Sequence, residues 1–137
     1  MVESGLSART IFVLWNVKMN FLVIAAGGAA GALIRVLSSQ MLAKVAPDLP
    51  WGTVCVNLAG SFLIGYLVSS FSLTYNQKLM ILGGFLGSLT TMSTFSLDVV
   101  QLIEQKKWLP AIAFWSASAI GSPVVCAFSM WLGGQAK

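Results

Sequence analysis

Four long apolar runs alternate with short polar turns along this chain. The runs cover about residues 21–43, 51–73, 79–103 and 109–133. Each is close to the roughly 20 residues that an α-helix needs to cross about 30 Å of hydrocarbon. The turns at 47–50, 72–78 and 104–108 carry the prolines, lysines and tryptophan typical of loops at headgroup depth. The pattern predicts an all-α integral membrane protein with four transmembrane helices.

Composition identifies the solvent of these helices. Of 137 residues, 57% are hydrophobic and 9% are charged, whereas a soluble domain is about 25% charged. A single soluble domain of this length has too little interior to bury so many apolar side chains. We therefore expect the lipid bilayer to surround most of the chain.

The first 18 residues, MVESGLSARTIFVLWNVK, differ from those that follow. They contain Arg9, Lys18 and a short apolar stretch like the centre of a signal peptide. No small-residue cleavage site follows that stretch, so we do not expect a cleaved signal. We interpret 1–18 as an N-terminal extension and 19–137 as the four-helix transmembrane domain. An alternative is that translation starts at Met19.

Basic residues are evenly divided between the two sides of the membrane. With four spans, one side would carry Arg9, Lys18, Lys78 and Lys137. The other side would carry Arg35, Lys44, Lys106 and Lys107. Because lysine and arginine normally gather at the cytoplasmic helix ends, an even count predicts insertion in both directions and an antiparallel, dual-topology homodimer. The alternative is a weak bias that the assumed loop boundaries hide.

Several classes of function are disfavoured by residues that the spans lack. There is no histidine, and the two cysteines, Cys55 and Cys126, are expected to be buried free thiols rather than part of a zinc site. The only acids near a membrane helix, Asp98 and Glu104, lie toward the end of the third. We therefore expect no enzyme and no nucleic-acid partner. A small four-helix proton-coupled drug exporter would need a carboxylate in the first helix, and a non-transport structural membrane protein remains an alternative.

The third helix has the most irregular sequence, GGFLGSLTTMSTFSLD at 83–98. Glycines followed by a run of hydroxyl residues have poor helix propensity and compete for backbone hydrogen bonds. We predict a break near residues 90–93, of the kind whose freed carbonyl groups commonly hold a cation. An alternative for the glycines is close helix packing through Gly83-xxx-Gly87, like Gly27-xxx-Gly31 in the first helix.

Neutral hydrogen-bonding side chains also lie inside the predicted second and fourth helices. Asn57 is in the second, and Ser118 and Ser122 are four residues apart, on one face of the fourth. The ordinary explanation for such a serine is a bond to its own i−4 carbonyl group or to a neighbouring helix.

Three segments resemble successive signatures of a known family. GGAAGALIR at 27–35, WGTVCVNLAGSFLIG at 51–65 and GFLGSLTTMSTFSLD at 84–98 are similar, in order and spacing, to the Fluc, or CrcB-type, fluoride channel family. The resemblance implies an antiparallel homodimer with two fluoride pathways and a structural Na⁺ at the dimer interface. It also implies passive export of fluoride from the cytoplasm across the bacterial plasma (inner) membrane, which relieves fluoride toxicity.

The resemblance also implies site residues. Asn57 matches the pore asparagine, Phe95 the second pore phenylalanine and Arg35 an arginine near the pore entrance. Thr94, Ser118 and Ser122 fall on the polar track beside them, whereas Gly87 and Thr90 match the carbonyl donors to sodium. Hydroxyl and amide donors and phenyl edges suit a small hydrated anion that must lose water. Three residues depart from the family pattern: Met92 for the first phenylalanine, Asp98 for glutamate and Ser88 for glycine.

Overall fold

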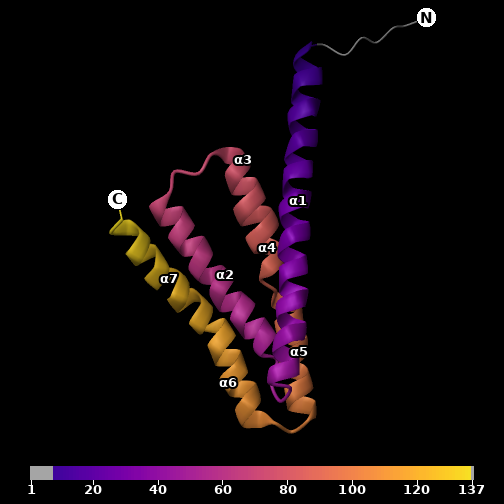
Figure 1. The fold of residues 1–137 in the computed structure, drawn as a ribbon, viewed down its shortest axis with the longest axis vertical. Helices are drawn as coiled ribbons and strands as arrows, with labels where there is room; N and C mark the ends of the chain where they lie inside the picture. Colours follow the sequence, from indigo (N-terminus) through magenta and orange to yellow (C-terminus); the bar gives the residue numbers. More distant parts are fainter. Residues whose placement is uncertain (1–7, 137) are drawn as a thin grey trace, which may run out of the picture.

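The computed structural model describes the backbone of residues 8–136 and the side chains of residues 17–136, and its regular elements in this range are all helical. Figure 1 shows them in chain order: α1 (Ala8–Val45), α2 (Trp51–Ser70), α3 (Tyr75–Gln77), η1 (Lys78–Leu86), α4 (Gly87–Leu89), α5 (Met92–Glu104), α6 (Trp108–Ala119) and α7 (Gly121–Gly134). Among the residues that the structure describes, four stretches are long and apolar enough to cross a membrane, namely Val17–Val45, Trp51–Ser70, Tyr75–Glu104 and Trp108–Gly134. The predicted set of four transmembrane helices is confirmed.

Helix α1 is much longer than the helix predicted at 21–43. Its 38 residues span ~57 Å at the α-helical rise, nearly twice the ~30 Å of a hydrocarbon core. Its N-terminal end projects beyond the other helices (Figure 1). Helix α1 passes through residue 18 without interruption, so no helix boundary separates residues 1–18 from residues 19–137. The division into an extension and a transmembrane domain stays a prediction. Residues 1–7 lie outside the described range.

The third span begins inside the turn that was predicted at 72–78. Thr74 caps it, because the Thr74 hydroxyl accepts from the backbone N–H of Gln77 and the Gln77 side chain accepts from the N–H of Thr74 at 2.9 Å. This reciprocal pair is the capping box, whose Thr-x-x-Gln signature was present in the sequence. Residues 75–78 of the predicted turn are therefore the first turn of a helix, whereas residues 72–74 lie outside it as predicted.

Helix α1 packs closely against η1, a π-helical segment, through glycines. A Cβ atom added at Gly31 would meet the carbonyl oxygen of Phe85. Facing it, a Cβ atom added at Gly84 would lie 2.6 Å from the carbonyl oxygen of Ile24. Lipid tails are as apolar as the helix surfaces, so the hydrophobic effect does not drive membrane helices together. Small residues instead let the two backbones approach closely enough for van der Waals packing.

This contact partly corrects the predicted small-xxx-small motifs. Gly27 and Gly31 do face a neighbouring helix, as predicted. In the third span the glycine that does so is Gly84, whereas a Cβ atom at Gly83 would have nothing within 4 Å. Because Gly83 meets no other part of the described chain, the interpretation of Gly83-xxx-Gly87 as a packing motif within one chain was wrong.

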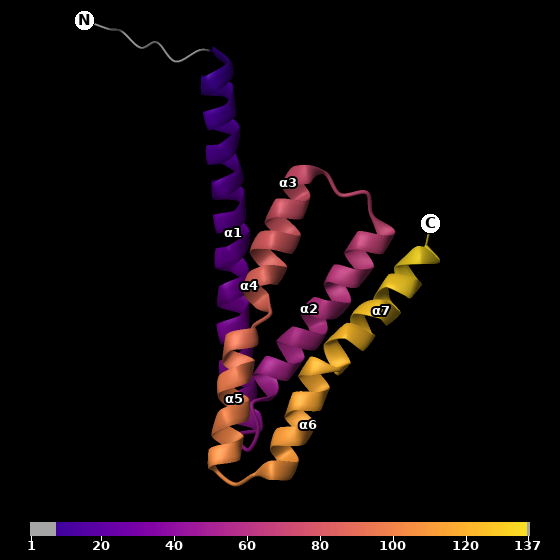
Figure 2. The same cartoon turned by 180° about the vertical axis from the view of Figure 1, so that it is seen from behind.

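Helices α2 and α7 form a second close pair. They lie side by side in both Figure 1 and Figure 2, and a Cβ atom at Gly65 would lie 2.5 Å from the carbonyl oxygen of Cys126. Cys126 is half-buried in this contact. Cys55 is exposed on the outside of α2, so the expectation that both thiols are buried was wrong for Cys55.

The third span breaks where the sequence predicted. Helix α4 ends at Leu89, Thr90 is extended (ψ 154°), and Thr91 (φ −149°, ψ 123°) precedes the first residue of α5. The break therefore occupies two consecutive threonines, within the predicted window of 90–93.

The fourth span has an irregularity that the sequence analysis did not predict. Ile120 (φ −98°, ψ −44°) separates α6 from α7, and Pro123 follows in the first turn of α7. Proline has no N–H, so the carbonyl group of Ala119 loses the donor that an unbroken helix would provide. The signal was present in the sequence as a proline inside an apolar run.

A test of the glycine contact compares Gly31→Val with Gly83→Ala. Valine at position 31 would collide with the η1 backbone, so we expect the free energy of unfolding to fall by about 1–3 kcal/mol. Alanine at the open position 83 should leave stability unchanged or raise it. Thermal unfolding of the purified protein in detergent measures both, and equal stability of the two variants would show that α1 and η1 are not so closely packed.

Candidate functional site

A cavity of about 500 Å³ lies where α2, the break between α4 and α5, and the joint between α6 and α7 come together. Most of the predicted site residues line it: Asn57, Gly87, Thr90, Met92, Phe95, Ser118 and Ser122. Thr94 and Arg35 are not among its lining residues. The structure thus brings three segments that are far apart in the sequence to one partly polar cavity inside the membrane-spanning region.

Asn57 joins α2 to the helix break. Its Oδ1 accepts a hydrogen bond from the backbone N–H of Thr91 at 2.9 Å, and its Nδ2 donates to the carbonyl oxygen of Thr91 at 3.3 Å. The Asn57 carboxamide therefore bonds both the N–H and the carbonyl group of Thr91, a residue that lies between two helices. An amide side chain has two donors and an acceptor with two lone pairs, so Asn57 keeps one N–H and one lone pair for the cavity.

Two carbonyl groups at the break lose their helical partners to these side chains. In an unbroken helix, Thr91 N–H would donate to Gly87 and Thr94 N–H would donate to Thr90. Here Asn57 accepts from Thr91, and the Thr91 hydroxyl accepts from Thr94 N–H at 3.2 Å. Within the described part of the chain, neither carbonyl oxygen accepts another hydrogen bond. These are the carbonyl groups predicted to hold sodium, and free oxygen atoms at a helix break suit that cation.

Thr91 is a functional residue that the predicted site omitted. It is buried, and its hydroxyl caps α5 by accepting from Thr94 N–H and donating to the Thr94 hydroxyl at 3.1 Å. Threonine is among the residues favoured at the N-cap of a helix, and this was the signal for Thr91 in the sequence. Thr94 takes part in this cap with its N–H and its hydroxyl oxygen, and its place on the polar track stays a prediction.

Ser118 and Ser122 have hydroxyl groups without a partner. Both Oγ atoms are buried and make no hydrogen bond to any described residue. Other hydroxyls in the spans do bond backbone carbonyls: Ser129 donates to Cys126 at 2.9 Å and Ser96 to Met92 at 2.9 Å. The ordinary explanation of a membrane-helix serine thus holds for those residues and not for the two beside the cavity. Burying an unbonded hydroxyl is unfavourable, so this pair needs another explanation.

Phe95 and Met92 lie in opposite environments although both line the cavity. Phe95 is only 4% exposed, and its ring stacks on Phe114 with centroids 5.6 Å apart and an interplanar angle of 25°. Met92 is 72% exposed. Phe95 is therefore a core aromatic that shows part of its ring to the cavity, whereas Met92 stands at the outer edge of the break.

Arg35 and Asp98, the charged residues singled out in the sequence, lie outside the cavity. Arg35 is half-buried on α1, and its buried Nε has no hydrogen-bond partner among the described residues. Asp98 accepts a hydrogen bond from the Thr53 hydroxyl at 2.7 Å and so ties α5 to the first turn of α2. A role for Arg35 near a pore entrance stays a prediction.

Four membrane-spanning helices, one broken beside a partly polar cavity, define the general class of membrane channels and transporters. The model of the family described as CrcB-like protein, Camphor Resistance (CrcB), matches residues 22–134. This chain belongs to the CrcB-like family.

Relatives of the chain carry a more specific description. A protein of Acinetobacter baumannii (strain ACICU) called fluoride-specific ion channel FluC is 40% identical over 121 residues, which are 83% of this chain and 96% of the relative. A protein of the same name from Hydrogenobaculum sp. (strain Y04AAS1) is 37% identical over 120 residues, 85% of this chain and 98% of that relative. The similarity therefore extends over nearly the whole length of both relatives.

The bond between Asn57 and the break can be tested with Asn57→Leu, which keeps size and removes both hydrogen bonds. Two backbone groups of Thr91 would lose their partners, so we expect the free energy of unfolding to fall by about 2 kcal/mol or more. Thermal unfolding in detergent measures it. The control is Asn76→Leu at an exposed position, which should leave stability unchanged, and an equally stable Asn57→Leu would contradict the bond.

Proposed function

We propose that this chain is a passive fluoride channel of the bacterial inner membrane that exports fluoride from the cytoplasm. The names of the relatives supply the ion. The structural observation that carries the proposal is the pair of unbonded serine hydroxyls, Ser118 and Ser122, beside the cavity.

The cavity groups suit an anion that is small and strongly hydrated. Ser118 and Ser122 each have an O–H without an acceptor, and Asn57 has one N–H to spare. A fluoride ion that enters from water must exchange its hydration shell for such donors, and neutral donors hold it less firmly than a fixed cation would. The edge of the Phe95 ring carries partial positive charge and adds a further weak contact.

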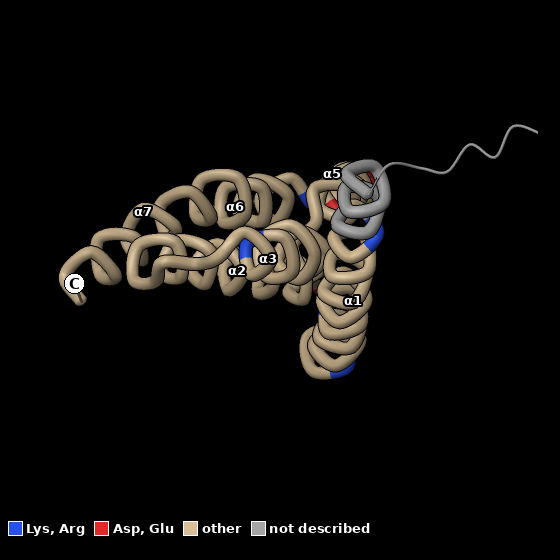
Figure 3. The backbone as a smooth tube through the Cα atoms, turned by 90° about the horizontal axis from the view of Figure 1, so that it is seen from above, with Lys and Arg blue, Asp and Glu red and all other residues tan. Residues whose placement is uncertain are grey.

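The working unit in this proposal is an antiparallel homodimer. At the middle of the third span the chain exposes Gly87, Met92, Ser93 and Ser96, next to the free carbonyl groups of the break. Lipid offers these polar groups no partner, so irregular backbone at this depth has to be covered by protein. A second copy is the cover that the family resemblance implies. Figure 3 shows how few charged positions the helices carry, which leaves little to fix a single orientation.

A sodium ion is the cofactor in this proposal. The carbonyl oxygens of Gly87 and Thr90 would hold it, with the same atoms of the second copy. When bound, the ion supplies positive charge that compensates the carbonyl dipoles at the dimer centre. The residues of this chain do the rest, because Asn57 and Thr91 keep those two carbonyl groups from pairing within the helix.

The double variant Ser118→Ala, Ser122→Ala tests the pathway. If the two hydroxyls donate to the passing ion, we expect passive fluoride efflux from proteoliposomes to fall at least about tenfold. Stability should be unchanged or higher, because no other group loses a partner. A fluoride electrode measures the efflux, with a chloride electrode run beside it.

The matched control is Ser129→Ala on α7, whose buried hydroxyl already bonds Cys126. It should lower stability slightly and leave fluoride efflux unchanged. Normal efflux in the double variant would remove the serines from the pathway, and equal chloride and fluoride efflux from the unaltered protein would refute the proposed function itself.

Dual topology predicts that a cysteine in the turn between α5 and α6 can be labelled from both sides of the membrane. Gln105→Cys in a background of Cys55→Ser and Cys126→Ala keeps every lysine that influences insertion. A membrane-impermeant maleimide should label about half of the protein in sealed vesicles and all of it after permeabilisation. Labelling that is complete, or absent, before permeabilisation would contradict the antiparallel dimer.

A further inference from the structure

The turn between α5 and α6 has an unusual backbone. Lys106 has φ 59° and is the one non-glycine residue with positive φ in the described part of the chain. Lys106 N–H donates to the carbonyl oxygen of Ile103, and Lys107 N–H donates to that of Leu102, both at 2.9 Å. These two bonds form the Schellman motif, whose left-handed position is normally glycine. Lysine is less favourable than glycine at a left-handed position, so the turn by itself does not explain this residue.

A groove runs up from this turn between α5 and α6. Its volume is about 280 Å³, and it is lined by Val99, Ile103, Trp108, Ala111, Ile112 and Trp115. All six side chains are apolar, although Trp108 is 60% and Trp115 47% exposed. From Trp108 to Trp115 the groove follows two turns of α6, ~10 Å. It is separate from the cavity described above, with which it shares no lining residue.

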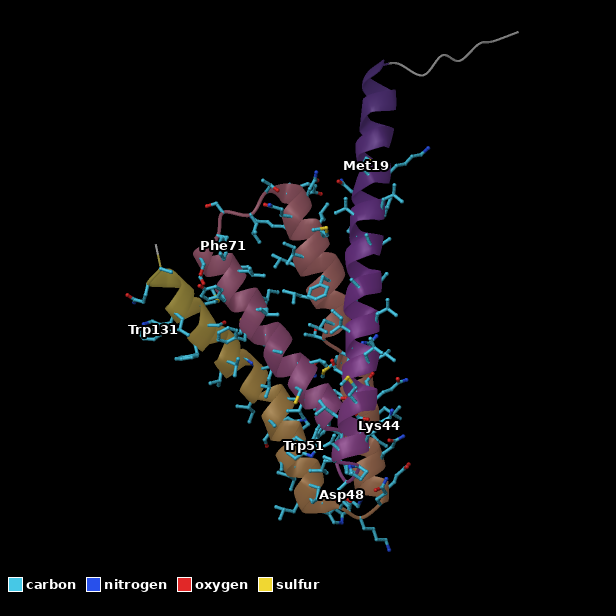
Figure 4. All side chains as sticks on the ribbon, in the orientation of Figure 1. Met19, Lys44, Asp48, Trp51, Phe71 and Trp131 are labelled. Carbon is cyan, nitrogen blue, oxygen red and sulfur yellow. The ribbon has the colours of Figure 1, made fainter. Side chains whose placement is uncertain are left out.

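The end of the groove at the turn carries positive charge. Lys106 and Lys107 are both exposed, and Glu104 is the one acid close to them in sequence, so the turn keeps a net positive charge. The first N–H groups of α6, at Trp108 and Leu109, belong to the N-terminal end of a twelve-residue helix, where partial positive charge gathers. Figure 4 places the labelled Lys44 and Asp48 at this same end of the molecule. Charged side chains at the ends of membrane helices normally lie at headgroup depth.

We propose that this groove and turn form a binding site for an anionic phospholipid. The upper part of one acyl chain lies in the groove against Trp108, Ile112 and Trp115. The phosphate of the headgroup lies at the turn, within reach of Lys106 and Lys107. Basic pockets between membrane helices at the interface recognise anionic headgroups in this way.

The charge at the turn selects a lipid as the occupant over a second copy of the chain. A transmembrane helix of a second copy would supply apolar surface to the groove but few anions to pair Lys106 and Lys107, because the chain has 4 acidic residues against 8 basic ones. A phospholipid has two parts that match this surface. Its anionic headgroup fits the basic turn, and the acyl chain attached to that headgroup fits the apolar groove beside the turn.

The test uses tryptophan quenching by phospholipids brominated on an acyl chain. Trp15→Phe, Trp51→Phe and Trp131→Phe leave Trp108 and Trp115 as the remaining tryptophans of the five. In proteoliposomes of phosphatidylcholine, brominated phosphatidylglycerol should quench these two at a lower mole fraction than brominated phosphatidylcholine. Lys106→Gln and Lys107→Gln should each raise the phosphatidylglycerol fraction for half-quenching about fivefold. Neither change should alter quenching by the zwitterionic lipid.

Two further variants separate lipid binding from the fold of the turn. Lys106→Gly relieves the left-handed strain, so it should raise thermal stability in detergent while weakening the preference for phosphatidylglycerol as much as Lys106→Gln does. The control is Lys78→Gln, an exposed lysine on η1, which should leave the preference unchanged. Equal quenching by the two lipids, an undiminished preference in the glutamine and glycine variants, or no quenching at all, as when a second copy covers the groove, would each overturn the proposal.

Discussion

The two hydrogen bonds between the Asn57 side chain and the backbone of Thr91 are the interaction on which the centre of the molecule depends. A membrane interior offers no water to an exposed peptide group, so a helix can break there only where protein covers the freed groups or a water-filled cavity reaches them. Asn57 meets this requirement from α2. Thr91 in turn caps α5 with its own hydroxyl, and the third span resumes immediately after the break.

The break has opposite effects on donors and acceptors. The Asn57 and Thr91 side chains accept from the N–H groups of Thr91 and Thr94, which leaves the carbonyl oxygens of Gly87 and Thr90 as free acceptors. Across the cavity, Ser118 and Ser122 provide unbonded donors instead. Acceptors that suit a cation and donors that suit an anion therefore belong to different residues around one cavity. None of the residues that line it carries a formal charge. This separation is what the proposed sodium and fluoride sites each require.

Much of this arrangement could be predicted from the sequence. The four spans follow from the lengths of the apolar runs, because a bilayer of fixed thickness demands about 20 apolar residues per helix. The break follows from glycines and hydroxyl residues packed into one helix, since both weaken helical hydrogen bonding. The membership of Asn57, Phe95, Ser118 and Ser122 in one cavity was also predicted, through the resemblance of their surrounding motifs to a known family.

Only the tertiary structure decided which partner each polar group has. The resemblance implied a pore role for Asn57 and a polar-track role for Thr94, and both stay predictions. The structure adds that Asn57 holds the backbone of the break and that Thr94 takes part in a helix cap. Ser122 and Ser129 look alike in the sequence, yet one is unbonded and the other satisfied. The apolar pattern determines that a helix exists and spans the membrane, because hydropathy acts on each segment alone. Hydrogen-bond partners depend on how neighbouring helices are rotated and spaced, which the packing of Gly31, Gly65 and Gly84 sets between segments far apart in the chain.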